Sequence, residues 1–211
     1  MELRDAFDQI STIRTQLAAT DRLRGLRALP VALSGGLALL AAMAQALWIP
    51  DPLRAPLPWL VLWIGAATIS ALAAALEIAR RVRESGSRLS VANAVLAVQQ
   101  FTPCLVVGAI VTTFVALRLP ELLWLLPGLW QLVFGLGNLA AVRLLPPPAF
   151  AVGAWYLATG ALSLWLGEAA LQPWVMGLPF ALGQGGLAAI LWWSHERPAA
   201  PPRRLSGEVR R

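Results

Sequence analysis

Residues that carry much of enzyme chemistry are nearly missing from this 211-residue chain. It has no lysine, one histidine (His195) and one cysteine (Cys104). A lone cysteine excludes an intramolecular disulfide, and a lone histidine cannot build a histidine-based metal site. An intramembrane Ser–His dyad is excluded because His195 follows the last long apolar run, at the edge of the membrane. The chain also lacks an HExxH motif, an aspartate cluster and a glycine-rich phosphate loop with lysine. We therefore expect no enzymatic activity, no metal and no cofactor.

Charged residues are also scarce. They make up 13% of the chain, whereas a soluble domain carries about 25%. Hydrophobic residues reach 58% and the mean hydropathy is +0.65. A chain this apolar cannot stay solvated as a disordered polymer, so the composition indicates a polytopic membrane protein.

Six apolar segments are long enough to cross a bilayer as helices, which takes about 20 residues each. Proline-rich and arginine-rich clusters separate them, where one helix stops and the next begins. The predicted spans are 29–49, 58–79, 91–117, 121–145, 149–171 and 173–193. The fourth is expected to end near Ala141, because Arg143 is costly deep in lipid. We predict an all-α bundle of six transmembrane helices.

Arginine is distributed very unequally between the two sides of this bundle. The N-terminal segment, the second and fourth loops and the C-terminal tail hold 15 arginines, while the other side has only Arg54 and Arg118. Basic residues are retained in cytoplasmic loops. We therefore predict that both termini are cytoplasmic, which agrees with an even number of spans.

The segment before the first span shows apolar residues at helical spacing: Leu3, Phe7, Ile10, Ile13 and Leu17. This pattern predicts an amphipathic cytoplasmic helix within residues 1–27. Such a helix lies on the membrane surface, packs under the bundle or docks a partner. Up to Thr20, its polar side has at least as many acidic as basic residues, which argues against the membrane surface because anionic lipids attract basic residues. Residues 28–196 form the predicted transmembrane domain, and 197–211 a disordered cytoplasmic tail.

Intramembrane polar side chains are the main candidates for function, because they are costly and usually face the bundle interior. Counting residues from the span ends places four glutamines near the bilayer centre: Gln99, Gln100, Gln131 and Gln184. The third, fourth and sixth spans, which contain these glutamines, each contain a proline as well: Pro103, Pro127 and Pro179. A proline leaves a backbone carbonyl one turn earlier without its helical hydrogen bond, and a glutamine amide is able to donate to such a carbonyl.

Two interpretations of the glutamines stay open. In the structural one, each amide bonds a carbonyl that a proline has freed on a neighbouring helix. In the functional one, Gln100, Gln131 and Gln184 converge on one ligand cavity with Trp130 as a wall. Gln99 and Gln100 are about 100° apart on their helix, so at most one faces the centre, and we favour Gln100.

Glu77 is the one acidic residue close to an intramembrane position, three residues before Arg80. It is either an interfacial carboxylate that pairs with Arg80 or Arg81, or a titratable group that reaches the cavity, as a proton-linked carrier needs.

The runs Leu119-Pro-Glu-Leu-Leu-Trp-Leu-Leu-Pro-Gly-Leu-Trp-Gln-Leu-Val-Phe-Gly-Leu-Gly137 and Gln172-Pro-Trp-Val-Met-Gly-Leu-Pro-Phe-Ala-Leu-Gly-Gln184 resemble an uncharacterised family of bacterial multi-span membrane proteins. The resemblance implies a multi-pass protein of the bacterial inner membrane, associated with genes for winged-helix transcriptional regulators.

These observations lead to two hypotheses of function. The first is a regulatory or sensory protein of the inner membrane that catalyses no reaction. It binds a small apolar or weakly polar ligand in the bundle, or a cytoplasmic partner such as a winged-helix regulator, and does not itself bind nucleic acid. The alternative is a small transporter or channel with a polar path from Glu77 to Gln131.

Overall fold

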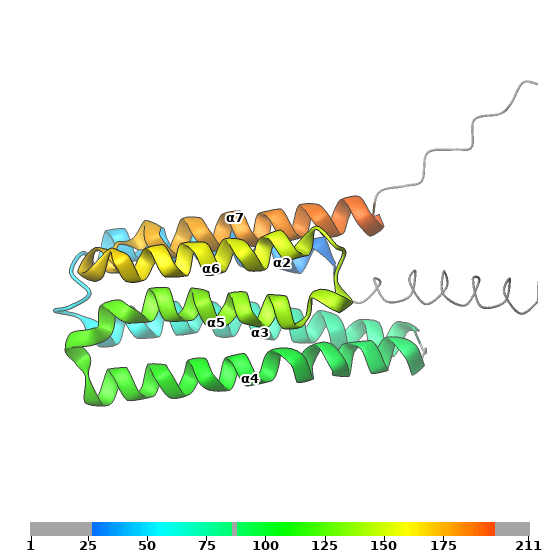
Figure 1. Cartoon of the computed structure of the whole chain (residues 1–211), viewed down its shortest axis with the longest axis horizontal. Coiled ribbons are helices and arrows are strands. Elements are labelled where there is room, and N and C mark those ends of the chain that lie inside the picture. Colours follow the sequence, from blue (N-terminus) through cyan, green and yellow to red (C-terminus); the bar gives the residue numbers. More distant parts are fainter. Residues whose placement is uncertain (1–26, 86–87, 197–211) are drawn as a thin grey trace, which may run out of the picture.

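The computed structural model describes residues 27–85 and 88–196. Six long helices run antiparallel in one bundle (Figure 1), and this part of the chain contains no strand, so the all-α prediction is confirmed. The helices are α2 (Ala28–Trp48), α3 (Pro56–Ser85), α4 (Arg88–Arg118), α5 (Leu126–Ala140), α6 (Ala149–Trp165) and α7 (Pro173–Leu191). Shorter turns flank them: η1 (Pro120–Leu125), η2 (Val142–Leu144), η3 (Gly167–Leu171) and η4 (Trp192–Glu196).

Five helical segments are long and apolar enough to cross a membrane, as a multi-pass membrane protein requires. Four of them lie in α2, α3, α4 and α7, and the fifth, Pro120–Ala140, joins η1 to the 15 residues of α5. Helix α6 has 17 residues, or about 25 Å of helix, which is shorter than the predicted span. Its expected outer part forms η3 instead, after a turn at Gly167. This glycine has φ +58°, a left-handed conformation that ends helices and that only glycine adopts without cost.

The helix connections fall at two ends of the bundle (Figure 1). One end, here called the outer end, holds the connections 49–55, 119–125 and 166–172. The other, the inner end, holds the start of α2, the α3–α4 and α5–α6 connections and the end of α7. That the inner end is cytoplasmic stays a prediction. The predicted amphipathic helix in 1–27 and the tail 197–211 lie outside the described residues, apart from Arg27.

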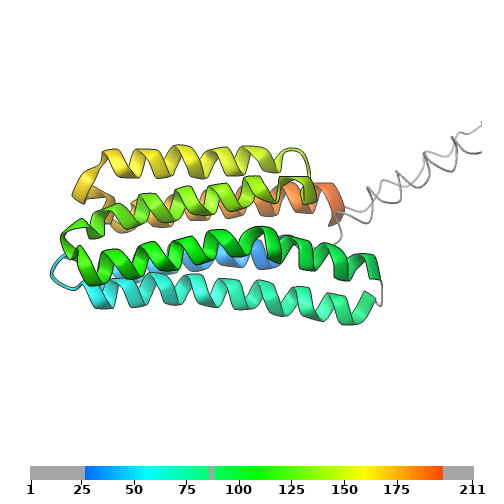
Figure 2. The ribbon, with the colours of Figure 1, turned by 60° about the horizontal axis from the view of Figure 1, so that its bottom comes forward.

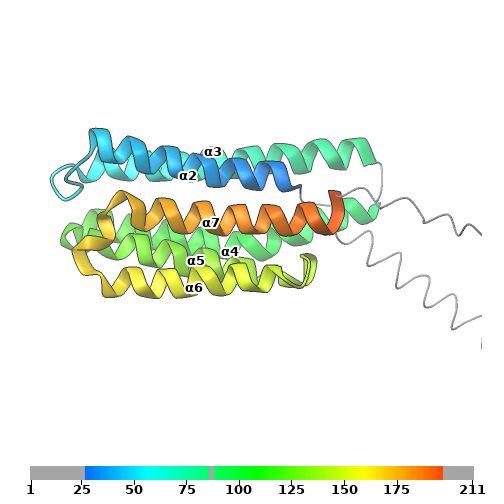
Figure 3. The same cartoon turned by 90° about the horizontal axis from the view of Figure 1, so that it is seen from above.

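Glycines bring two helix pairs into close contact: α2 against α7, and α5 against α6 (Figures 2 and 3). A Cβ atom on Gly177 would lie 2.5 Å from Ala42 Cβ, and one on Gly160 would lie 2.9 Å from the Gly128 carbonyl oxygen. Small residues promote helix association in membranes because they let backbones approach and make extensive van der Waals contact. These two pairs are the most closely packed helices of the bundle.

Helices α3 and α4 lie at the periphery. Only 17% and 11% of their apolar spans are buried, against 33–44% for the spans of α2, α7 and the fourth segment. They are also the longest helices, with 30 and 31 residues. Their ends extend past the other helices at the inner end (Figure 2).

The fourth span differs from its prediction as one continuous helix. Its first residues form the η1 turn, and α5 begins only at Leu126. Pro127 therefore lies in the first turn of α5, where its missing N–H removes no helical bond, so its expected position in the middle of a helix is wrong. Pro103 and Pro179 do lie inside helices. The end of α5 at Ala140 confirms that the span stops before Arg143.

Candidate functional site

Gln131 of α5 is completely buried between α6 and α7. Its Nε2 donates to Ser163 Oγ of α6 and to the Val175 carbonyl oxygen of α7, each at 3.1 Å. Val175 is four residues before Pro179, whose ring nitrogen cannot donate to that carbonyl. Gln131 therefore supplies the hydrogen bond that the proline removes, which is the contact that the structural interpretation of the glutamines predicts.

One atom of this amide is left over. Gln131 Oε1 is buried and accepts no hydrogen bond. Rotating the amide by 180° would not help, because it would point the oxygen at the Val175 carbonyl and at a hydroxyl that donates to the Thr159 carbonyl. A buried acceptor without a donor carries a desolvation cost of about 1–3 kcal/mol, so the gain from the two Nε2 bonds is partly offset.

Gln184 of α7 is also buried, at the contact between α7 and α2. A Cβ atom on Gly35 of α2 would lie 3.1 Å from Gln184 Cβ. The stem of this glutamine thus packs against a glycine of the neighbouring helix, within the closest helix pair of the bundle.

The adjacent glutamines of α4 point in different directions, as their 100° separation requires. Gln99 is exposed, whereas Gln100 is half-buried and its Oε1 is buried without a hydrogen-bond partner. Of the two, Gln100 is therefore the one that turns toward the bundle, as we favoured. Phe101, the next residue, lies against Gly137 near the inner end of α5, so both amides lie toward the inner end of the bundle.

The three predicted site glutamines lie at three different depths and do not converge. Gln131 meets α7 at Val175, and Gln184 is nine residues farther along α7, or about 13 Å along the axis. Phe101, next to Gln100, lies against Gly137, six residues beyond Gln131 and thus about 9 Å along α5. Residue counts from the span ends placed Gln131 too deep, because the first residues of the fourth span form η1 and α5 starts only at Leu126.

Aromatic rings fill the interior between these depths. Phe134 of α5 lies at the centre, and its ring centroid is 5.3 Å from Phe101 (α4), 4.9 Å from Tyr156 (α6) and 5.3 Å from Phe180 (α7). Tyr156 is fully buried, and its hydroxyl donates a long bond of 3.5 Å to the Phe180 carbonyl. These rings link four helices where a shared glutamine cavity was expected.

Trp130, the predicted wall of that cavity, takes part in packing instead. Its indole stacks on Trp59 of α3, with centroids 5.4 Å apart and planes 8° from parallel. Its Nε1 donates to Thr112 Oγ1 of α4 at 2.7 Å. Trp130 therefore joins α3, α4 and α5, whereas Gln131, its neighbour in sequence, faces α6 and α7. A role for either residue in ligand binding stays a prediction.

Gln45 of α2 forms the most extensive polar network, and the sequence analysis missed it. Its Oε1 accepts from the indole Nε1 atoms of Trp59 (3.1 Å) and Trp63 (2.7 Å), and its Nε2 donates to the Leu171 carbonyl at 2.7 Å. Gln45 is 1% exposed and the two indoles 1% and 4%. Two features of the sequence could have indicated it: Gln45 lies in the first span, and the second span carries two tryptophans four residues apart, on one face of a helix.

Glu77 of α3 pairs with Arg80, with its Oε2 4.0 Å from the Arg80 Nε. This is the first of the two alternatives from the sequence. The ion pair links two residues of one helix, in the inner part of α3.

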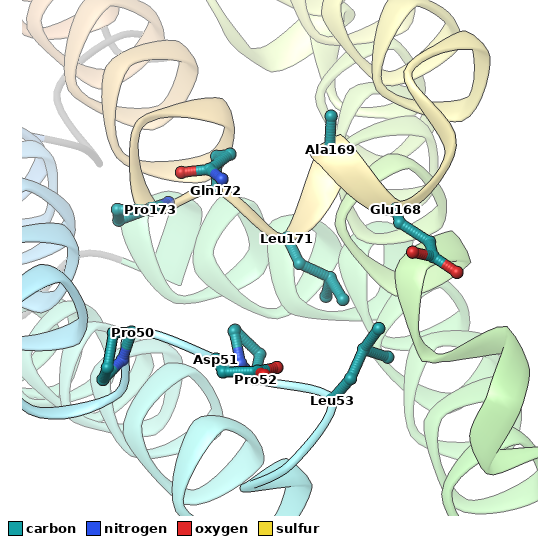
Figure 4. Close-up of a pocket in the computed structure, with 9 residues that line it drawn as sticks. All are labelled: Pro50, Asp51, Pro52, Leu53, Glu168, Ala169, Leu171, Gln172 and Pro173. Carbon is teal, nitrogen blue, oxygen red and sulfur yellow. The ribbon is translucent and has the colours of Figure 1, made fainter.

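An open pocket of about 280 Å³ lies at the outer end (Figure 4). Residues 50–53 of the α2–α3 connection form one side of the pocket, and residues 168, 169 and 171–173 form the other. It contains two carboxylates: Asp51, which pairs with Arg54 at 3.0 Å, and the exposed Glu168. Leu171, whose carbonyl accepts from Gln45, also lines it, so the pocket lies directly above the Gln45 network.

The chemistry of these sites is that of hydrogen bonding and packing. Among residues 27–85 and 88–196, no group of three or more His, Cys, Asp or Glu side chains lies close enough together to hold a metal ion. No known protein family, curated protein or solved structure matches this chain.

Proposed function

We propose that the protein is a regulatory or sensory membrane protein that catalyses no reaction and binds a small polar ligand in the outer pocket. One observation carries the proposal: Leu171 of the pocket is bonded to Gln45, and the same amide holds Trp59 and Trp63 of α3. A ligand that displaces residues 168–173 would therefore act on α3 through a single buried side chain.

The contacts beyond Gln45 support a path to the inner end. Trp59 stacks on Trp130, and Trp130 donates to Thr112 of α4. These contacts connect the pocket with α3 and α4, which are the helices with the least burial and the greatest extension at the inner end. The proposal requires that the bundle has two conformations and that the ligand binds one of them more tightly, because only a difference in affinity changes their populations.

The pocket restricts the ligand chemistry. A volume of about 280 Å³ is at the small end of ligand sites, which begin at about 300 Å³. Asp51 and Glu168 favour a cation or a hydrogen-bond donor. The ligand in this proposal is more polar than the sequence suggested, and its site lies at the rim and not among the glutamines.

The response would be read at the inner end by a cytoplasmic regulatory protein, in the bacterial inner membrane. A winged-helix regulator is the partner that the family resemblance suggests. Co-purification from native membranes, with and without residues 1–20, tests this part. Recovery of no cytoplasmic protein, together with no effect of the deletion, would argue against it.

Ligand binding is tested on purified protein with choline and spermidine as cationic probes and acetate as the anionic control. We expect a cation to raise the melting temperature and to change the tryptophan emission of the wild-type chain. Glu168→Gln should weaken both effects. Gln45→Leu should keep binding but lose the emission change, because the pocket is no longer bonded to the indoles. Equal responses to all three probes would contradict the proposal.

The alternative, a small carrier, draws on a different observation: Gln100 Oε1 and Gln131 Oε1 are buried without donors, and a hydrated path would supply them. Purified protein in liposomes, assayed for proton flux, decides between the two functions. Flux that Glu77→Gln abolishes would establish the carrier, and absence of flux with intact ligand binding would favour the sensor.

A further inference from the structure

A shallow groove of about 430 Å³ runs along the outer part of α4. Side chains of this one helix line it: Ala109, Ile110, Thr113, Phe114, Leu117 and Arg118. The two small residues, at 109 and 113, lie among the three large apolar ones. Those three side chains are 56–74% exposed, so the rest of the described chain leaves them largely uncovered. The groove therefore opens away from the bundle, toward the lipid of a membrane.

The length of the groove is close to the thickness of one leaflet. Ala109 and Arg118 are nine residues apart, or about 13 Å along the helix axis, against about 15 Å for half of the hydrocarbon core. Arg118 is the last residue of α4 and lies at the outer end of the bundle. An acyl chain that follows the groove therefore brings its headgroup to the guanidinium.

The charge at the outer end of the groove is not neutralised within the described part of the chain. Arg118 is exposed and forms no ion pair with residues 27–85 or 88–196, not even with Glu121, three residues later. Arg54, the other arginine at the outer end, pairs with Asp51. A guanidinium binds a phosphate through charge-assisted hydrogen bonds. Arg118 is therefore the outer cation that is available to a lipid phosphate.

We propose that this groove binds an anionic phospholipid, with the phosphate on Arg118 and one acyl chain along residues 109–117. A zwitterionic lipid fits less well, because it carries its own cation beside the phosphate. A second copy of the chain also fits less well. Copies in one membrane share an orientation, and a two-fold contact brings the same patch of both chains together. Two Arg118 guanidiniums would then meet at one depth and repel each other.

Lipid titration followed by native mass spectrometry tests this inference, which does not depend on the proposed ligand. The probes are phosphatidylglycerol and phosphatidylcholine with identical acyl chains, added to the purified full chain in detergent. We expect tighter binding of phosphatidylglycerol. Arg118→Gln should weaken it about fivefold, which corresponds to about 1 kcal/mol, the contribution of one basic residue near an anionic membrane surface. Arg54→Gln is the matched control and should bind as the wild type does. Equal binding by the two variants would overturn the inference.

The apolar part of the groove is tested separately, with Arg118 intact. Ala109→Phe fills the groove and should weaken phosphatidylglycerol binding, whereas Ala67→Phe, at an exposed alanine of α3, should not. Both variants place phenylalanine on an exposed helix surface, so both should fold. Glycerol 3-phosphate, a soluble headgroup analogue, should not displace the lipid. Displacement by it, or unchanged binding in Ala109→Phe, would overturn the inference. A protein dimer that Ala109→Phe abolishes would also overturn it and would assign the groove to a second copy.

Discussion

At the scale of single residues, buried glutamines hold the bundle together by completing backbone hydrogen bonds. Gln131 donates to the Val175 carbonyl and Gln45 to the Leu171 carbonyl. Neither carbonyl has a helical partner, because Pro179 has no N–H to donate and Leu171 lies in the connection that precedes α7. An amide that reaches from a neighbouring helix is well suited to this task, since it has two donors and one acceptor.

A double-mutant cycle tests this role for Gln131. Gln131→Leu should lower the free energy of unfolding in detergent by about 1–2 kcal/mol, because the Val175 carbonyl loses its donor. In a Pro179→Ala background, the new N–H of residue 179 bonds that carbonyl, and the same substitution should cost less. Thermal or denaturant unfolding of the four variants gives the coupling energy. Equal costs in both backgrounds would show that the carbonyl is not what Gln131 serves.

A larger effect is expected at Gln45. Gln45→Leu removes the acceptor of two buried indole N–H groups, and each orphaned donor costs about 1–3 kcal/mol. We expect a fall in melting temperature and an altered tryptophan emission, measured on protein in detergent. Gln99→Leu is the matched control, because this glutamine is exposed and should tolerate leucine. A Gln45→Leu variant as stable as the control would mean that the network contributes little.

The same residues show where prediction from the sequence stops. Trp48 and Trp165 are exposed near the outer end, as the preference of tryptophan for the headgroup level predicts. Trp59 and Trp63 also lie near the outer end, in the first turns of α3, but they face inward to Gln45, a direction that the headgroup preference does not predict. Residue counting fixes depth along a helix but does not say which helix is the neighbour, so it could not find the bonds of Gln131 and Gln45.

At the scale of elements, hydropathy predicts helices more reliably than their ends. The first span, predicted as 29–49, is α2 (Ala28–Trp48), and the last begins at Pro173 as predicted. The third, predicted as 91–117, belongs to a helix that starts at Arg88. Helix α4 begins before the predicted span because none of residues 88–90 breaks a helix. The fourth and fifth spans contain apolar turns, η1 and η3, which hydropathy alone does not distinguish from helix.

Helix contacts through glycine lead to a prediction for α5 and α6. In Gly160→Ala, the new Cβ would lie 2.9 Å from the Gly128 carbonyl oxygen and from the Leu132 nitrogen. Backbone atoms cannot move aside cheaply, so we expect a loss of about 1–3 kcal/mol of stability, although alanine is the better helix former. Gly185→Ala is the control, since nothing lies within 4 Å of its Cβ position. Unfolding in detergent should rank the control above Gly160→Ala, and the reverse order would refute close packing here.

At the scale of the whole molecule, the position of both termini depends on α6. Six crossings put the start of α2 and the end of α7 on one side, as the arginine distribution predicts for the cytoplasm. Five helical segments meet the length for a span, α5 only together with η1, while α6 has 17 residues, or about 25 Å against a hydrocarbon core of about 30 Å. Thinning of the bilayer around α6 accommodates such a difference at modest cost.

Cysteine labelling across α6 decides this point. In a Cys104→Ala background, single cysteines replace Arg143 and Glu168, which lie before and after α6, and Arg83 and Leu53 serve as references for the inner and outer ends. With a membrane-impermeant maleimide on spheroplasts, we expect labelling at positions 53 and 168, and labelling at 83 and 143 only after permeabilisation. Labelling of 143 and 168 from the same side would show that α6 does not cross. The chain would then have five crossings, and the start of α2 and the end of α7 would lie on opposite sides.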